Sequence, residues 1–330
     1  MHQAPIDRRR ALGLLAASGA LASPLAALAQ AGYPNKPINL IVGFAPGGSA
    51  DITARLFAER LRVELGQPVI VENRPGAGGN IGADVVVRAP KDGYTLLLAA
   101  AAQIVINPSL YKSMTFNPAK DLAPITQLQV EHNLMVVGPA VPVKTLTEFI
   151  AYAKAHPNEI TFASPGNGSP AHLAGELLNQ RAGLKMQHVP YKGTGPAITD
   201  LIAGNVTMAI DNMPALLPQV KSGKLRALAV ASDKRAAAAP EIPTMAEAGM
   251  KGYVVMAWKG LMAPAGTPAP IIARLHDAAV KVIAMPDMRE KMISLGAEPV
   301  GSTPAQFAET IQRETQSWAA LIKSTGTTIE

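Results

Sequence analysis

The sequence repeats one local design, in which an apolar run of strand length leads through a glycine-rich turn into a helix. In the first copy, Ile38–Val42 predicts a strand, Pro46-Gly47-Gly48 a bend, and residues 50–58 a helix capped by Ser49. The N-terminus of such a helix offers unpaired N–H groups and a positive dipole end, which favour anions. The design recurs at residues 73–84, 164–176 and 191–200. These anion-ready turns predict a shared cleft.

Strands and helices alternate along the chain, which indicates an α/β protein with a mostly parallel sheet. The 330 residues, of which 48% are hydrophobic, can form two domains or one large one. Ligands of such sheets bind at the carboxyl ends of the strands, where the glycine-rich turns lie. An extended stretch at residues 250–264 is long enough to cross between two domains.

The first residues have the pattern of a secretory signal peptide. Arg8-Arg9-Arg10 precedes an apolar run at residues 11–28, which ends in small residues. We expect residues 1–29 to form this leader, with cleavage after Ala29 or Ala31, and the mature protein to act in the periplasm. Export by the Sec route or the twin-arginine route is compatible with the leader.

Composition excludes several classes of function. Removal of the leader lowers the formal net charge from +6 to +4, and the remaining basic residues are scattered, so nucleic-acid binding is not expected. The absence of cysteine excludes disulfides and thiolate metal sites. The glycine-rich loops match neither nucleotide-binding motif, so we expect no cofactor. His172 and Glu176 have the spacing of a polar contact on one helical face, and no metal site is expected.

Two serines could serve a hydrolase, because Ser49 and Ser169 both follow a strand and precede a helix. Neither has the second glycine of the G-x-S-x-G motif. Ser169 followed by Pro170 is better explained as a helix cap that also donates to a ligand. We therefore expect no enzyme, and keep a serine hydrolase that uses Ser49 or Ser169 as the alternative.

Five motifs in order resemble the Bug family, the extracytoplasmic solute receptors of tripartite tricarboxylate transporters. They are Gly-Phe-Ala-Pro-Gly-Gly-Ser-Ala-Asp (43–51), Val-Glu-Asn-Arg-Pro-Gly-Ala-Gly-Gly-Asn (71–80), Ser-Pro-Gly-Asn-Gly-Ser-Pro-Ala-His-Leu (164–173), Pro-Tyr-Lys-Gly-Thr-Gly-Pro-Ala (190–197) and Trp-Lys-Gly-Leu-Met-Ala-Pro (258–264). The resemblance implies a type II periplasmic-binding-protein fold, in which two α/β domains joined by two crossing strands enclose a ligand cleft. Domain 1 would comprise 32–131 plus 254–330, and domain 2 would comprise 132–253.

The resemblance also implies a set of ligand-binding residues on both sides of the cleft. In domain 1 these are Phe44, Ala45, Gly47, Gly48, Ser49, Asp51, Ala101 and Gln103. In domain 2 they are Ser164, Gly168, Ser169, Ala171, Tyr191, Lys192, Gly193 and Asp211. Phe44 would form a wall and the glycines and serines would donate to the ligand.

The implied function is capture of a small organic carboxylate, with a dicarboxylate favoured, by domain closure and its delivery to membrane permease subunits. A ligand-dependent partner of a sensor ectodomain is a third alternative. The sequence leaves the identity of the ligand open, as well as the roles of Asp211 and of Lys259, where an aromatic residue is common among relatives.

Overall fold

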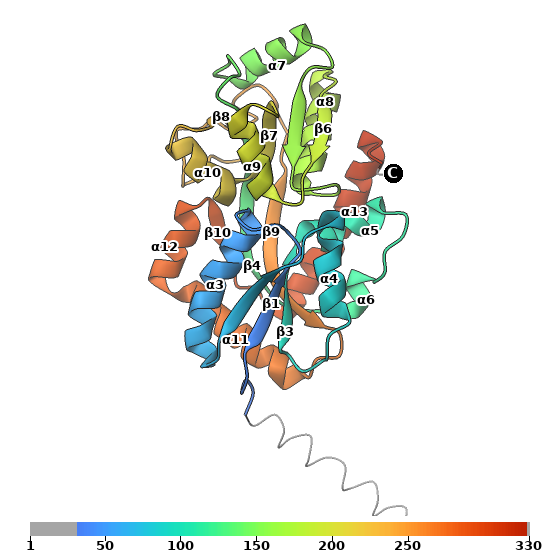
Figure 1. The fold of residues 1–330 in the computed structure, drawn as a ribbon, viewed down its shortest axis with the longest axis vertical. Helices are drawn as coiled ribbons and strands as arrows, with labels where there is room; N and C mark the ends of the chain where they lie inside the picture. The colour runs from blue at the N-terminus through green and yellow to red at the C-terminus, as the bar shows by residue number, and fades with distance from the viewer. Residues whose placement is uncertain (1–31, 329–330) are drawn as a thin grey trace, which may run out of the picture.

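A computed structural model describes residues 32–328 and has two α/β halves, one above the other (Figure 1). The predicted signal peptide lies outside the described residues. The lower half, domain 1, contains β1 (Ile38–Val42), β2 (Val69–Asn73), β3 (Thr95–Ala100), β9 (Met256–Pro264) and β10 (Ala297–Pro299). The upper half, domain 2, contains β5 (Thr161–Ser164), β6 (Gln187–Pro190), β7 (Met208–Asn212) and β8 (Arg226–Val230).

One long strand, β4 (Leu122–Val137), runs through both halves. It pairs with β9 as far as His132 and with β7 from Asn133 onward. The strand is continuous over its 16 residues, and its pairing with β9 shifts register on either side of Thr126 and Gln127. The chain returns to domain 1 through residues 253–255 and β9.

The outer strands are parallel, as the sequence predicts, since β1 pairs with β2 and β3, and β5 pairs with β6 and β7, in parallel. The centre differs, because β9 and β4 run antiparallel to their neighbours. A mostly parallel sheet is therefore a wrong prediction for the middle of the molecule. Strands that cross between domains connect the two sheets and are not part of strand-helix-strand units.

The helices of domain 1 cover both faces of its sheet. Leu40 of β1 belongs to an apolar cluster with Phe57 of α3 and Leu275 of α11, whereas the next residue, Ile41, belongs to a second cluster that includes Val86 of α4. This alternation is what a strand buried on both sides requires. The elements are α3 (Ser49–Leu65), η1 (Ala77–Gly79), α4 (Asn80–Val87), η2 (Ala102–Ile106), α5 (Asn107–Leu110), α6 (Pro118–Asp121), α11 (Ala269–Ala284), α12 (Pro286–Ser294) and α13 (Pro304–Thr325).

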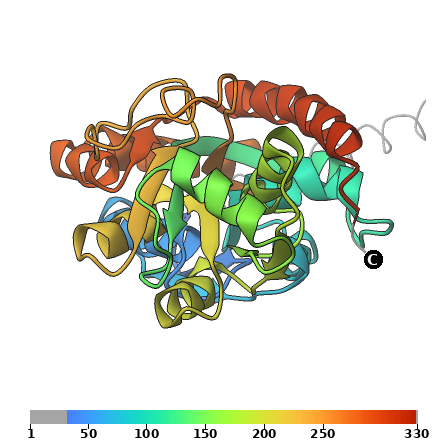
Figure 2. The same cartoon turned by 90° about the horizontal axis from the view of Figure 1, so that it is seen from above.

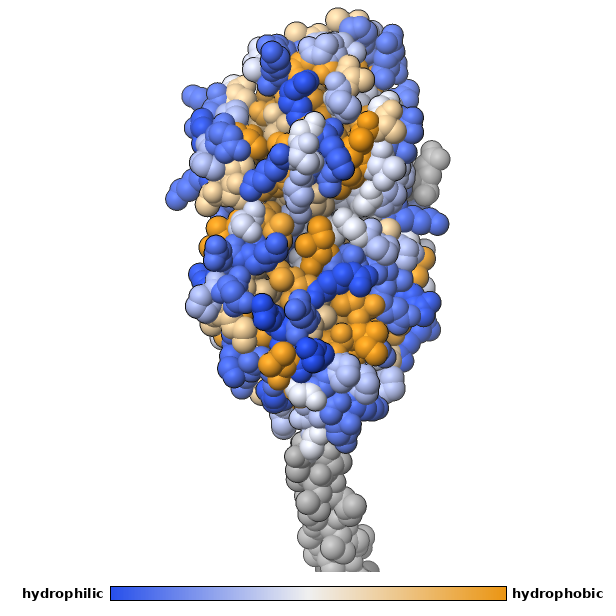
Figure 3. Space-filling view, turned by 60° about the vertical axis from the view of Figure 1, so that its left-hand side comes forward, coloured by the Kyte–Doolittle hydropathy of each residue, from blue (hydrophilic) through white to orange (hydrophobic). Residues whose placement is uncertain are grey.

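Domain 2 is layered in the same way, and the view from above shows its helices around the sheet (Figure 2). Its helices are α7 (Leu146–Ala155), α8 (Pro170–Ala182), α9 (Thr194–Ala203) and α10 (Met213–Lys221). Phe162 of β5 packs toward α8, and the adjacent Ala163 packs toward α9. On the face of the molecule shown in Figure 3, hydrophilic side chains cover much of both halves, with apolar patches between them. Within residues 32–328, no helix is long and apolar enough to cross a membrane.

Candidate functional site

A small buried cavity of about 30 Å³ lies between the two domains. The N-terminal ends of α3, α8 and α9 meet there, represented by Ser49, Ser169 and Thr194. The complete lining is Phe44, Gly48, Ser49, Ala50, Ala100, Ala101, Ala102, Pro165, Ser169, Pro170, Thr194, Asn212, Ala257 and Lys259. Helix N-termini from both domains therefore converge on a largely apolar space.

The start of α3 differs from the prediction, because the N-cap residue is Gly48 and no side chain caps the helix. Ser49 is already inside the helix, so the prediction that it caps α3 is wrong. Asp51 orders the preceding turn, since its carboxylate accepts a hydrogen bond from the Gly47 N–H at 3.0 Å and pairs with Arg55. Within residues 32–328, no side chain caps the first N–H groups of α3, which also lack an intrahelical acceptor.

The Ser49 hydroxyl instead belongs to a buried network centred on Glu131. Ser49 Oγ lies 2.6 and 2.7 Å from the two Glu131 carboxylate oxygens, and Gln129 Nε2 donates to Oε1 at 2.6 Å. Lys259 Nζ lies 2.8 Å from Glu131 Oε2, and both side chains of this ion pair are buried. Both oxygens of the Glu131 carboxylate therefore have hydrogen-bonding partners.

The start of α8 agrees with the prediction. Ser169 is its N-cap and accepts a hydrogen bond from the His172 N–H at 3.1 Å, while Pro170 occupies the first helical position. The Gly168 N–H in turn donates to His172 Nδ1 at 3.3 Å. His172 Nε2 lies 3.9 Å from Glu176, which is the polar contact expected from their spacing.

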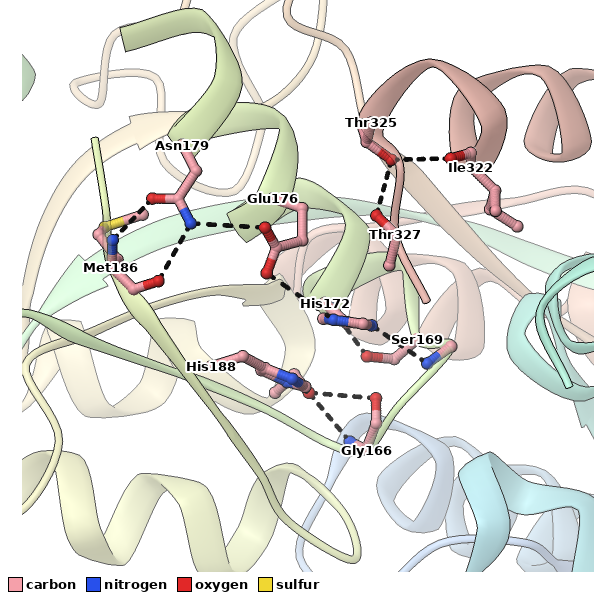
Figure 4. A network of polar contacts seen from close by, with 12 residues as sticks. Gly166, Ser169, His172, Glu176, Asn179, Met186, His188, Ile322, Thr325 and Thr327 are labelled. Carbon is pink, nitrogen blue, oxygen red and sulfur yellow. Dashed lines mark hydrogen bonds and ion pairs between the residues drawn. The ribbon is translucent and has the colours of Figure 1, made fainter. Parts of the chain in front are cut away.

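Two histidines support the loop that precedes α8 (Figure 4). The rings of His172 and His188 stack at 3.9 Å, and His188 Nε2 lies 2.6 Å from Ser164 Oγ, which also contacts Gly166. Burial lowers the pKa of His172 to about 4. Burial and the neighbouring His172 lower the pKa of His188 to about 3. Both rings are thus neutral near pH 7.

Asp211 lies behind the start of α9. Its carboxylate accepts hydrogen bonds from Thr194 Oγ1 and from the Asn212 N–H, both at 2.7 Å. Burial raises the pKa of Asp211 to about 6, although these bonds and the charge of Lys259 oppose the shift. Both oxygens are engaged with the protein, and Asp211 is not part of the cavity lining.

The domains contact each other beside the cavity. The Ala45 N–H donates to the Lys192 carbonyl at 2.8 Å, and the Tyr111 hydroxyl donates to the Asn167 carbonyl at 3.4 Å. The backbones of the two domains come close together at Gly195, where a Cβ atom would overlap the carbonyl oxygen of Pro46, so this approach requires glycine. The cleft is therefore closed at this edge by backbone groups of both domains.

The structure separates the predicted site residues into three groups. Phe44, Gly48, Ser49, Ala101 and Ser169 line the cavity. Phe44, Tyr191 and Lys192 line a second cavity of about 200 Å³ that shares Phe44 and Pro165 with the first. The others hold the surrounding loops or are buried beside them, namely Ala45, Gly47, Asp51, Gln103, Ser164, Gly168, Ala171, Gly193 and Asp211.

Several residues of the site were not predicted. Thr194, Asn212 and Ala257 line the cavity, and Glu131 lies directly behind Ser49 and Lys259. Thr194 is part of the quoted 190–197 motif and could have been proposed from it. Glu131 carries no local signal, because only the pairing of β4 with β9 brings it to the cleft.

Comparisons with known proteins agree with this architecture. Residues 53–327 match the model of the tripartite tricarboxylate transporter family receptor. The chain is 40% identical over 316 residues to protein BugT of Bordetella pertussis, covering 96% of each chain.

Two solved structures are also similar. Rpa4515 of R. palustris with adipate has a TM-score of 0.87 and 35% identity, covering 89% of this chain and 98% of that one. MatC from Rhodopseudomonas palustris with bound malate has a TM-score of 0.84 and 33% identity, covering 88% and 100%. The matched segment, the identity to BugT and the two-domain fold together show that the chain belongs to the tripartite tricarboxylate transporter receptor family of periplasmic solute-binding proteins.

Proposed function

We propose that the cavity between the domains binds a small organic carboxylate, with a dicarboxylate favoured. The observation that carries this proposal is the convergence of the N-termini of α3, α8 and α9 on one buried space. Each helix N-terminus can stabilise an anion by up to about 2 kcal/mol in a partly buried geometry. Phe44 and the alanines of the lining would contact the carbon skeleton.

The relatives support the chemical class of the ligand. Of the two similar structures, Rpa4515 is with adipate and MatC has bound malate, and both molecules are dicarboxylates. The residues at the helix starts are the best candidates for contact with such a ligand, namely Gly48, Ser49, Ser169 and Thr194.

Binding would be coupled to closure of the domains. We assign residues 32–131 plus 254–330 to domain 1 and 132–253 to domain 2, with hinges where β4 changes partners and where the chain enters β9. A ligand between the helix starts touches both domains only in the closed form, so it favours that form. The Ala45–Lys192 hydrogen bond would then be made in the closed form and lost on opening.

The serine hydrolase alternative has no geometric support. The Ser49 hydroxyl is bound to a carboxylate, and the Ser169 hydroxyl accepts from a backbone N–H as a helix cap. Neither arrangement supplies the histidine base that activates a nucleophilic serine. We therefore propose that the chain binds its ligand without turnover, and nothing observed favours the sensor ectodomain.

The signal-peptide pattern and the family membership indicate how the protein reaches its site of action and where the ligand goes. Residues 1–29 would direct export and be removed, and the loaded receptor would deliver the carboxylate to the membrane subunits of its transporter.

A thermal-shift screen of residues 32–330 tests the proposal directly. We expect stabilisation by succinate, malate or adipate but not by their diamides, which have the same skeletons without charge. A ligand at a hundred times its Kd stabilises the folded state by about 2.7 kcal/mol, which is several degrees for a chain of this size. Equal shifts with acids and diamides, or no shift with any acid, would contradict the proposal.

A further inference from the structure

One residue of the cavity lining, Lys259, carries a buried positive charge, and the helix N-termini alone do not explain its presence there. Lys259 lies on β9, and its side chain is 3% exposed. In the strand register Lys259 faces Gln129 of β4, so Glu131 is its diagonal neighbour across the two strands that connect the domains. The ion pair therefore lies where those strands pass the cleft.

Glu131 has no free capacity to bind a ligand. Its two oxygens accept hydrogen bonds from Ser49, Gln129 and Lys259, and the side chain is fully buried. It is also absent from the lining of the cavity. Glu131 consequently fixes the positions of Ser49 and Lys259 rather than contacting the contents of the cavity.

Lys259 has free capacity. A lysine ammonium has three N–H donors, and among the described residues 32–328 the one acceptor for Lys259 Nζ is Glu131. Lys259 also lines the cavity, whose other walls are mostly apolar. A buried ammonium with unused donors is costly unless an acceptor binds beside it, which favours an anionic ligand group at this point.

The neighbouring polar groups do not offer a site for a ligand cation. Both oxygens of Asp211 accept from Thr194 and Asn212, and Asp211 does not line the cavity. Asn212 does line it, and its buried amide oxygen has no hydrogen-bonding partner. A neutral amide is thus the acceptor available to a ligand hydroxyl, whereas no free carboxylate is available to an ammonium in the lining described.

We propose that Lys259 determines the specificity of the cleft by binding one carboxylate of a dicarboxylate, while the helix N-termini bind the other. Glu131 is a positioning residue that holds the ammonium toward the cavity. The arrangement favours a diacid over its monoamide, and over an amino diacid, whose ammonium would lie near Lys259 without a free carboxylate partner. This inference rests on the proposed function.

Calorimetric titration of residues 32–330 tests the role of Lys259. The probes are succinate and adipate, each compared with its monoamide, which keeps the size and removes one charge. We expect the wild type to bind a diacid about tenfold or more tighter than its monoamide, since the amide group cannot form a charge-assisted hydrogen bond with the Lys259 ammonium through an ionised oxygen. Aspartate should bind more weakly than succinate.

Two variants distinguish the effect of the Lys259 charge from the effect of the Glu131 charge that holds it in place. Lys259→Met alone leaves Glu131 as a buried unpaired charge, so the informative pair is E131Q, which keeps the ammonium, and the double variant E131Q/K259M, which has neither charge. E131Q should retain the preference for the diacid, and E131Q/K259M should lose it. The exposed Lys120→Met serves as the control and should match the wild type. Thermal melts verify that each variant is folded.

Two results would overturn the inference. If E131Q/K259M discriminates diacid from monoamide as strongly as the wild type does, Lys259 does not determine specificity, although the proposed function stands. If the wild type binds neither the diacids nor their monoamides, the proposed function fails and the inference fails with it.

Discussion

The N-terminal ends of α3 and α8 present similar sequences to the same cavity, yet the two serines have different roles. In Gly48-Ser49 the glycine is the N-cap, and the serine donates to Glu131. In Ser169-Pro170 the serine is the N-cap, because proline occupies the first helical position. A shift of one position relative to the helix start therefore decides whether a serine stabilises its own helix or a distant carboxylate.

The two starts are also supported by different chemistry. Domain 1 holds its helix start with a buried ion pair, Glu131 and Lys259, whereas domain 2 holds its loop with the neutral rings of His172 and His188. Removing one partner of a buried ion pair lowers the unfolding free energy of the protein strongly, because the other charge is left unpaired. A pair of buried neutral histidines lowers it when the rings must take up protons in acid. The comparison thus predicts that the two sides of the cleft respond to different perturbations.

Removal of Glu131 should have the largest effect. Glu131→Leu leaves the Lys259 ammonium buried without its carboxylate, and breaking a buried pair in this way costs about 3–5 kcal/mol of unfolding free energy. Denaturant unfolding measures the loss, with E131Q/K259M as the charge-neutral control that should lose less. Equal losses in the two variants would show that the charge imbalance is not the cause.

The two serines should differ in their effect on stability. Ser49→Ala removes a donor from a buried carboxylate, and hydrogen bonds to charged groups contribute about 1.5–3 kcal/mol. Ser169→Ala removes an N-cap, which typically costs about 1 kcal/mol. Denaturant unfolding of both variants at pH 7 should therefore show the greater loss for Ser49→Ala, and the reverse order would contradict the roles assigned here.

The histidine support should make domain 2 sensitive to acid. The pKa of His172 is lowered to about 4 in the folded protein, so the unfolded chain takes up a proton first as pH falls. Its contribution to stability is complete above pH 6.5, the pKa of the unfolded state, and is lost as pH falls from there toward 4. Asp211 has the opposite sign, because a folded pKa of about 6 makes its contribution grow as pH falls below 6.

His172→Gln tests the contribution of His172, since His188 and Asp211 are present in both proteins. Unfolding free energies at several pH values between 7 and 4 should fall less steeply for His172→Gln, by up to about 1.4 kcal/mol per pH unit. Parallel curves for the two proteins would show that His172 does not titrate between the folded and unfolded states.

Local patterns in the sequence predict much of the fold. The outer strands, the glycine turns and the Ser169-Pro170 helix start each depend on neighbouring residues, and all of them form. Serine is a favoured cap, so the sequence predicts Ser49 as the cap of α3, whereas the helix begins one residue earlier and its N-cap is Gly48. Boundaries of this kind depend on tertiary contacts, here the contact of Ser49 with Glu131.

The polar centre of the site could not be predicted in this way. Glu131 and Lys259 are 128 residues apart, and their contact requires the antiparallel register of β4 and β9. The sequence leaves the roles of Lys259 and Asp211 open. The resemblance implies that Asp211 binds ligand, whereas in the structure both its oxygens accept hydrogen bonds from the protein and it lies outside the cavity lining. Residue type alone does not reveal which polar groups remain free.

Binding of succinate, malate and adipate to Gly195→Ala, measured by calorimetry, tests most directly the claim that the domains close on a carboxylate. Gly195 lies in the first turn of α9, where alanine favours the helix, yet a Cβ atom there would overlap the Pro46 carbonyl oxygen of the other domain. We predict a folded protein whose affinity for the diacids falls about tenfold or more, with the exposed Thr199→Ala on the same helix as an unaffected control. Wild-type affinity in Gly195→Ala would contradict closure of the two domains on the ligand.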